Sequence, residues 1–180
     1  LKNVLANPAI FDTQKLLWMN GQYIREIDEK TFNKIAHESI ETSLSRDLFS
    51  EEIDRINLIL SVVQERLETL NDLTKQVKFL LDEPFNVDEK EWEEVNSNVA
   101  QDYLTNIRNE FKTMKDFELD KIEEMMREEL KKLDLKPKEG FQAARVAITG
   151  TKISPPLFES IYALGQSSTI ARIAEKIDNL

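Results

Sequence analysis

Helical periodicity is the feature that most constrains the fold of this 180-residue chain. Between residues 53 and 81, mostly apolar side chains recur at steps of three and four, which places them on one face of a helix. The residues that carry the pattern are Ile53, Ile56, Leu60, Val63, Leu67, Leu70, Thr74, Val77 and Leu81. The pattern predicts one long core helix or two helices broken near Asn71 and Asp72, and a coiled coil is the alternative.

The remainder of the chain has the same helical period, so we predict an all-α fold. Pro84 ends the first helical region, and Asn86 or Asp88 is expected to cap the next helix. Helical spacing then runs from residue 92 to about 114, and a further helix follows Asp116 or Asp120 to about residue 133. Its two methionines, at 125 and 126, are expected to fill the core.

Residues 135–140 are predicted to interrupt the helices again. Ser154 then has the form of an N-cap followed by a proline at the first helical position, and Gly165 is expected to end that helix. Ser167 or Ser168 can cap the last helix. Residues 146–148 could form a short strand, but a helix there is the simpler prediction.

Composition argues against catalysis within this chain. Cysteine is absent, the four glycines are too far apart to form a phosphate-binding loop, and His37 is the only histidine. An acidic run at Glu89, Glu91, Glu93 and Glu94 could be read as a magnesium site, but its helical spacing favours a solvated face. We therefore predict no catalytic residue, no metal site and no bound cofactor here. The apolar runs are too short to span a membrane.

Charge is distributed unevenly along the chain. The formal net charge is −10, which argues against a generally basic nucleic-acid-binding module. Residues 131–180, however, carry eight basic and five acidic side chains, a net charge of +3, which leaves −13 on the first 130 residues. This distribution is compatible with a local surface that contacts phosphates or bases.

Two sequence blocks resemble a known family. The first is FDTQKLLWMNGQYIR at residues 11–25, and the second comprises RVAITG at 145–150, SPPLFES at 154–160 and the Leu-Gly pair at 164–165. Both resemble the C-terminal region of bacterial-type glutamyl-tRNA synthetases, which are class I enzymes, and they occur in the family's order. The resemblance covers the whole chain and implies a helical anticodon-binding region.

The resemblance also implies how the chain is organised. Residues 1–45 would be the remainder of a stem-contact region, and residues 46–88 and 89–180 would form two helical anticodon-binding subdomains. The HIGH and KMSKS motifs of the family are absent from the sequence. ATP-dependent glutamylation is therefore expected in an N-terminal catalytic domain outside this chain, and the missing initial Met fits a piece of a longer protein. The expected partner is the anticodon stem-loop of glutamate tRNA, bound by a cytoplasmic monomer.

Site residues are carried over from the family at a few positions. Arg66 matches an arginine that contacts the third anticodon base in enzymes that usually accept glutamate tRNA and reject glutamine tRNA. Arg145, Ser154 and Leu157 match positions near the first two bases. Three lysines are candidates for phosphate contacts: Lys136, Lys138 and Lys152.

Simpler roles remain open for these residues. Arg145 could pair with Glu139 or Glu159, Ser154 could be only an N-cap, and Leu157 could be only a core residue. A different function is also open for the chain as a whole, namely a helical protein-interaction module. It would bind a partner helix through the 53–81 stripe, the row of mostly apolar side chains described above for residues 53–81.

Overall fold

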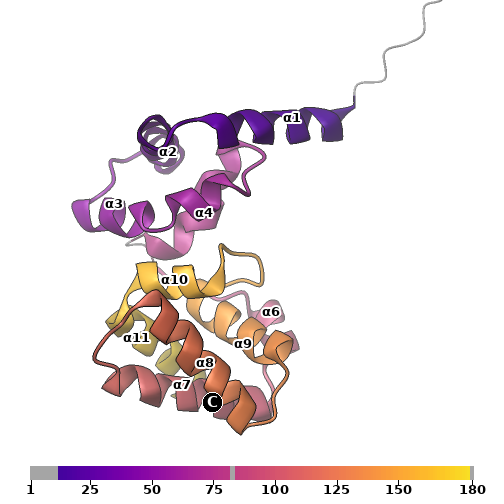
Figure 1. Cartoon of the computed structure of the whole chain (residues 1–180), viewed down its shortest axis with the longest axis vertical. Coiled ribbons are helices and arrows are strands. Elements are labelled where there is room, and N and C mark those ends of the chain that lie inside the picture. Colours follow the sequence, from indigo (N-terminus) through magenta and orange to yellow (C-terminus); the bar gives the residue numbers. More distant parts are fainter. Residues whose placement is uncertain (1–11, 82–83, 179–180) are drawn as a thin grey trace, which may run out of the picture.

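The computed structural model describes residues 12–81 and 84–178, and every regular element among them is helical (Figure 1). The first part contains α1 (Thr13–Glu26), α2 (Glu29–Leu44), α3 (Ser50–Asn57), α4 (Leu60–Gln64), the 3-10 turn η1 (Leu70–Asp72), α5 (Leu73–Val77) and the 3-10 turn η2 (Lys78–Leu80). The second contains α6 (Glu89–Val95), α7 (Asn98–Thr113), α8 (Leu119–Lys132), α9 (Pro137–Thr149), α10 (Leu157–Leu164) and α11 (Gln166–Asp178). The all-α prediction is confirmed, and residues 146–148 lie within α9.

The prediction for residues 53–81 was wrong in its helix lengths. The stretch forms short pieces, α3 to η2, rather than one long helix, two helices or a coiled coil. One physical cause is that carbonyls of the 64–68 segment accept hydrogen bonds from side chains of α1, so the backbone has partners outside a helix. The stripe is nevertheless buried in the chain's own core, with Ile56 and Val77 fully buried, so it is not a free surface for a partner helix.

Predictions for the later helices were partly correct. The region 92–114 is divided at Ser97, whose hydroxyl accepts a hydrogen bond from Ala100 N (3.2 Å) and caps α7. Asp88 caps α6 as expected, and α8 has the predicted bounds within a few residues. The interruption at 135–140 is shorter than predicted, because α9 already begins at Pro137, a residue suited to the first turn.

The start of α10 corrects a specific prediction. Pro156 occupies the N-cap position, and the Ser154 hydroxyl makes no capping bond, because it interacts with Arg145 and Pro155 instead. Gly165, with a φ of +85°, ends α10 as expected. The last helix, α11, begins at Gln166, so Ser167 and Ser168 lie inside it and are not its caps.

The helices form two groups, which Figure 1 shows one above the other. The first helical group is α1 to η2, the second helical group is α6 to α11, and α10 packs against α3 and η2 at the junction. Asp88 N also donates to Gly150 O (2.9 Å) and fixes the connecting segment to the end of α9. One apolar core runs through both groups. The division at residues 45 and 88 stays a proposal, and residues 1–11, including Phe11 of the first sequence block, lie outside the described residues.

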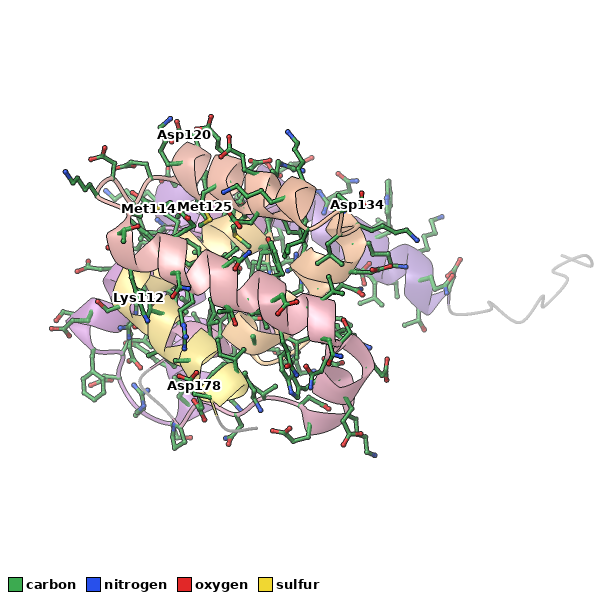
Figure 2. All side chains as sticks on the ribbon, turned by 90° about the horizontal axis from the view of Figure 1, so that it is seen from below. Lys112, Met114, Asp120, Met125, Asp134 and Asp178 are labelled. Atoms are coloured by element: carbon green, nitrogen blue, oxygen red, sulfur yellow. The ribbon has the colours of Figure 1, made fainter. Side chains whose placement is uncertain are left out.

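The end of the second helical group far from the junction is seen in Figure 2, where α7 and α8 lie side by side. Met114, which follows α7, and Met125 of α8 lie close together there, and both are partly buried against the core. Met126 is fully buried. The prediction that the methionine pair fills the core is therefore confirmed.

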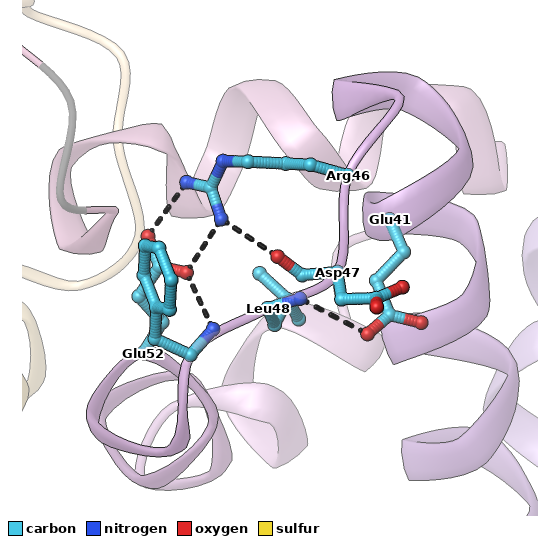
Figure 3. A network of polar contacts seen from close by, with 6 residues as sticks. Glu41, Arg46, Asp47, Leu48 and Glu52 are labelled. Carbon is cyan, nitrogen blue, oxygen red and sulfur yellow. Dashed lines mark hydrogen bonds and ion pairs between the residues drawn. The ribbon is translucent and has the colours of Figure 1, made fainter.

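A buried ion pair stabilises the turn between α2 and α3 in the first helical group (Figure 3). Both carboxylate oxygens of Glu52 accept hydrogen bonds from Arg46, each at 2.8 Å, and Oε2 also accepts from Phe49 N (2.9 Å). The Glu52 side chain is 0% exposed and that of Arg46 is 28% exposed. Leu48 N donates to Glu41 nearby (3.1 Å). The network connects the end of α2, the turn and the start of α3.

Candidate nucleic-acid interface

Arg145 lies near the end of α9 and turns toward the loop that precedes α10. Its Nη1 donates to Pro155 O (2.6 Å), to Ser154 O (3.3 Å) and to the Ser154 hydroxyl. Burial lowers the pKa of Arg145, the positive charge of Arg66 lowers it further, and Glu159 opposes the shift. Neither Glu139 nor Glu159 forms an ion pair with it among the described residues. The expected alternative of a simple Arg145–carboxylate pair is therefore wrong.

Arg66 follows α4, on the other side of the junction between the two helical groups, and its side chain is exposed. It forms no side-chain hydrogen bond or ion pair within residues 12–81 and 84–178. Its positive charge lowers the pKa of Arg145, so the two cations interact electrostatically, although 78 residues separate them in the sequence. Two neighbouring guanidinium groups repel each other, so an anionic or electron-rich ligand between them is favoured.

The segment that carries Arg66 is fixed to α1 and the turn after it. Asn20 Nδ2 donates to Glu68 O, and Arg25 Nη1 donates to Glu65 O (3.2 Å). Gln64 Nε2 donates in the opposite direction, to Ile24 O and Ile27 O, each at 2.8 Å. These bonds bracket Arg66, so α1 positions it.

Gly21 completes this contact. A Cβ at Gly21 would lie 3.0 Å from Leu67 O, so the absence of a side chain permits the close approach. Asn20, Gly21 and Arg25 all belong to the first sequence block. Sequence reasoning did not assign them this role, because nothing in the local pattern indicates which distant carbonyls they meet.

The other two base-contact candidates have different surroundings. Ser154 is partly buried, and its hydroxyl lies against Arg145 Nη1, so it can contribute to the same polar site. Leu157 is only 5% exposed and belongs to the apolar core. Its position favours the core role, with little side-chain surface left for a base.

The three lysine candidates are not gathered beside the arginines. Lys152 forms an ion pair with Glu94, and its backbone N donates to Glu91. Lys136 and Lys138 are exposed at the start of α9, seven to nine residues before Arg145. That separation is roughly 10–14 Å along a helix. Lys136 also lies 3.9 Å from Glu139.

The acidic run on α6 has partners of its own. Glu89 pairs with Lys176 (2.7 Å), while Glu91 and Glu94 hold the loop at Lys152. The residues that the structure describes contain no cluster of three or more side chains able to hold a metal ion. The run was predicted to be a solvated face, and the structure shows that it also fixes neighbouring elements.

His37 joins two helices of the first helical group. Its Nε2 lies 2.9 Å from Asn57 Oδ1, which links α2 to the end of α3. The contact gives His37 a structural role, and the prediction that it is not catalytic stays a prediction.

A cleft of about 150 Å³ lies between the two helical groups. Its basic side chains are Lys75, Lys78 and Arg172, and none of the described side chains that line it is acidic. Arg172 donates to Phe79 O (2.7 Å) and Ile148 O (2.6 Å), and its guanidinium lies 3.8 Å from the Phe85 ring centroid. Burial, followed by the charge of Arg55, lowers the pKa of Arg172 to about 10, so it is charged at pH 7. The cleft has no signal in the sequence, because Lys75 and Arg172 are nearly 100 positions apart.

Among the residues described here, no helix is long and apolar enough to cross a membrane.

The charge distribution along the sequence suggested that the basic side chains of the site lie in the last fifty residues. The structure shows basic side chains of the first helical group there as well. These are Arg66, Lys75 and Lys78.

Comparison with known proteins identifies relatives over nearly the whole chain. The glutamate–tRNA ligase of Symbiobacterium thermophilum is 31% identical over 179 residues, which cover 97% of this chain and 36% of that protein. The glutamate–tRNA ligase of Cutibacterium acnes is 33% identical over 180 residues, which cover 95% of this chain and 36% of that protein. The chain thus spans about a third of the length of these curated relatives.

Solved structures show the same fold. The crystal structure of a glutamate tRNA ligase from Elizabethkingia meningosepticum superposes with a TM-score of 0.77 at 19% identity, over 94% of this chain and 33% of that one. Residues 22–177 match the family described as the anticodon binding domain. This match covers most of the sequence, and the chain therefore belongs to the anticodon-binding domain family.

Proposed function

We propose that this chain is the anticodon-recognising part of a glutamate–tRNA ligase. The observation that carries the proposal is that Arg145 contacts the hydroxyl of Ser154 while Arg66, from the other helical group, interacts electrostatically with Arg145. Single-stranded RNA loops expose unstacked bases, whose edges hydrogen-bond to guanidinium and hydroxyl groups. In this arrangement Arg66 reads the third anticodon base, while Arg145 and Ser154 face the first two.

The two arginines differ in how many of their side-chain donors are available to RNA. Arg66 is exposed and keeps its donors available, so it can contact a base directly. One nitrogen of Arg145, Nη1, is engaged by its own loop, and the structure records no bond from Nη2 or Nε to a described residue. Nη2 and Nε of Arg145 can therefore donate hydrogen bonds to RNA while Nη1 holds the loop.

Glutamylation itself belongs, in this proposal, to a part of the enzyme outside the chain, which would also bind ATP. The relatives support it, because this chain matches only about a third of their length. Helix α1 adds a structural observation: the large apolar side chains of Leu16, Met19 and Tyr23 are exposed on one face of it, and Trp18 is exposed on another. Exposed apolar surface of this kind is typical of a face that another structure covers. We propose that the ligase's catalytic part lies there, in a cytoplasmic, monomeric enzyme.

The direct test is binding of the 180-residue chain to glutamate tRNA, measured by fluorescence anisotropy across a salt series. We expect binding that weakens as salt increases, and that weakens further when the anticodon alone is replaced. Equal affinity for glutamate tRNA and for the same tRNA with an unrelated anticodon would contradict the proposal.

A further inference from the structure

We propose that the cleft between the helical groups is a phosphate-binding subsite, in which Lys75 and Lys78 hold the backbone of the same RNA strand whose bases meet Arg66 and Arg145. The inference rests on the proposed function and adds to it the residues that bind the backbone. The phosphate-binding role therefore belongs to lysines of the first helical group, and not to Lys136, Lys138 or Lys152.

The described side chains of the cleft are positively charged or neutral. Lys75, Lys78 and Arg172 line one cleft of about 150 Å³, and none of its described lining side chains is acidic. Lys75 is 83% exposed at its side chain, and its ion pair with Asp72 has a distance of 4.0 Å, at the limit for such a pair. Lys78 forms no ion pair with any residue that the structure describes. A concentration of positive charge in a concave site attracts a polyanion such as RNA.

The three cations of the cleft have different roles. Both terminal nitrogens of Arg172 donate to carbonyls, and the guanidinium lies over Phe85, so this side chain is fixed as a wall of the cleft. It contributes a permanent positive potential. The two exposed lysines are flexible, and each has three ammonium protons to donate to phosphate oxygens.

The cleft adjoins the proposed base-reading site at Ser154. Ser154 lines the cleft and also contacts Arg145, so it forms a wall shared by the two sites. A strand whose bases meet Arg145 can therefore place an adjacent phosphate in the cleft. Ile153, which is 80% exposed, lies on the lining and offers apolar surface to a sugar or base.

The size of the cleft restricts what it holds. Sites for whole drug-sized ligands have volumes of about 300–1,000 Å³, and this cleft is smaller. A phosphate group with its sugar matches it better than a complete nucleotide cofactor. The lysines at 136 and 138 line none of this cleft, and Lys152 is already paired with Glu94.

The experiment compares the parent chain with Lys75→Gln/Lys78→Gln and with a matched control, Lys136→Gln/Lys138→Gln. Binding of glutamate tRNA and of three single-base anticodon variants is measured from low to moderate salt. For the cleft variant we expect the same fold-loss of affinity with every RNA, and a salt slope reduced by about 0.7 for each single-stranded phosphate contact that is lost. The control should keep the parent slope, and Lys75→Arg/Lys78→Arg should restore most of the binding.

Parent-like affinity and slope in Lys75→Gln/Lys78→Gln would overturn the subsite, while loss of anticodon discrimination in Arg66→Gln would still support the proposed function. A loss confined to one anticodon variant would also overturn it, because phosphate contacts carry no base preference. Failure of the parent chain to discriminate anticodons at all would instead reject the proposed function, and with it the cleft as its subsite. Thermal unfolding of each variant checks that the exposed substitutions leave the fold intact.

Discussion

The two helical groups position their arginines by different physical means. The first helical group consists largely of short pieces, and side-chain to backbone hydrogen bonds from α1 hold the segment around Arg66. The second group consists mainly of longer amphipathic helices packed on fully buried residues such as Ile107 and Phe111. Single polar contacts therefore determine the position of Arg66, whereas apolar packing holds the helix that carries Arg145.

The largest effect is expected for Glu52→Gln in the first helical group. The substitution removes the charge that pairs with Arg46 inside a buried network, and breaking such a pair costs about 3–5 kcal/mol of unfolding free energy. Urea denaturation measures the change. The matched control is Glu123→Gln in the second group, whose partner Arg127 lies on the surface, with an expected cost of about 0–1 kcal/mol. Equal losses of unfolding free energy in Glu52→Gln and Glu123→Gln would contradict the proposed difference between the two helical groups.

Arg172→Gln tests the contact that joins the groups. It deprives the carbonyls of Phe79 and Ile148 of charged donors, and a hydrogen bond to a charged group contributes about 1.5–3 kcal/mol. Because Arg172 is only partly buried, water can replace part of these two bonds, so we expect a net destabilisation of about 2–3 kcal/mol rather than their full sum. Arg172→Lys should recover part of the lost stability, because the lysine ammonium can still donate to one of the two carbonyls. A variant as stable as the parent by thermal unfolding would show that the groups are held together without this residue.

Asn20→Ala isolates the positioning of Arg66. Losing the single bond to Glu68 O should cost about 1 kcal/mol of stability and should also weaken discrimination at the third anticodon base. The control is Asn57→Ala, which removes a bond to His37 in the same helical group. This control should have a similar effect on stability and none on base discrimination. Equal RNA binding by both variants would show that the α1 contact does not position Arg66.

The smallest effect under ordinary conditions concerns Tyr103 in the second group, and it emerges only at high pH. Burial raises the pKa of this phenol, which donates to Met126 O (3.2 Å), above its ordinary value of 10.0. As the pH rises, the phenol of the unfolded chain loses its proton before that of the folded chain. The contribution of the protonated Tyr103 to the unfolding free energy is therefore complete below pH 10.0, and it decreases above that pH by about 1.4 kcal/mol per pH unit. Urea unfolding of the parent and Tyr103→Phe at pH 9 and 11 measures the difference. An identical pH dependence in both would contradict the burial of an un-ionised phenol.

Local patterns predicted some elements better than others. Asp88 as a cap, the bounds of α8 and the end of α10 at Gly165 follow from side-chain types within a few residues of each site. The break in the 53–81 stripe and the role of Ser154 could not be predicted in this way. Both depend on partners distant in the sequence, α1 in one case and Arg145 in the other.

The candidate site shows the same limit. The assignments of Arg66 and Arg145 came from resemblance to a family, because neither charge nor periodicity distinguishes them from other arginines. Their proximity is a property of the tertiary structure. The cleft of Lys75, Lys78 and Arg172 has no sequence signal, since its cations come from α5, η2 and α11.

The central claim is that two arginines from different helical groups read different bases of one anticodon. The most direct measurement is a set of double-mutant cycles that combines the parent, Arg66→Gln and Arg145→Gln with glutamate tRNA and its three single-base anticodon variants. We predict that Arg66→Gln abolishes discrimination at the third base alone and Arg145→Gln at the first two, each by about 1–3 kcal/mol. A uniform loss of affinity for all four RNAs, with no coupling to any base, would contradict the account.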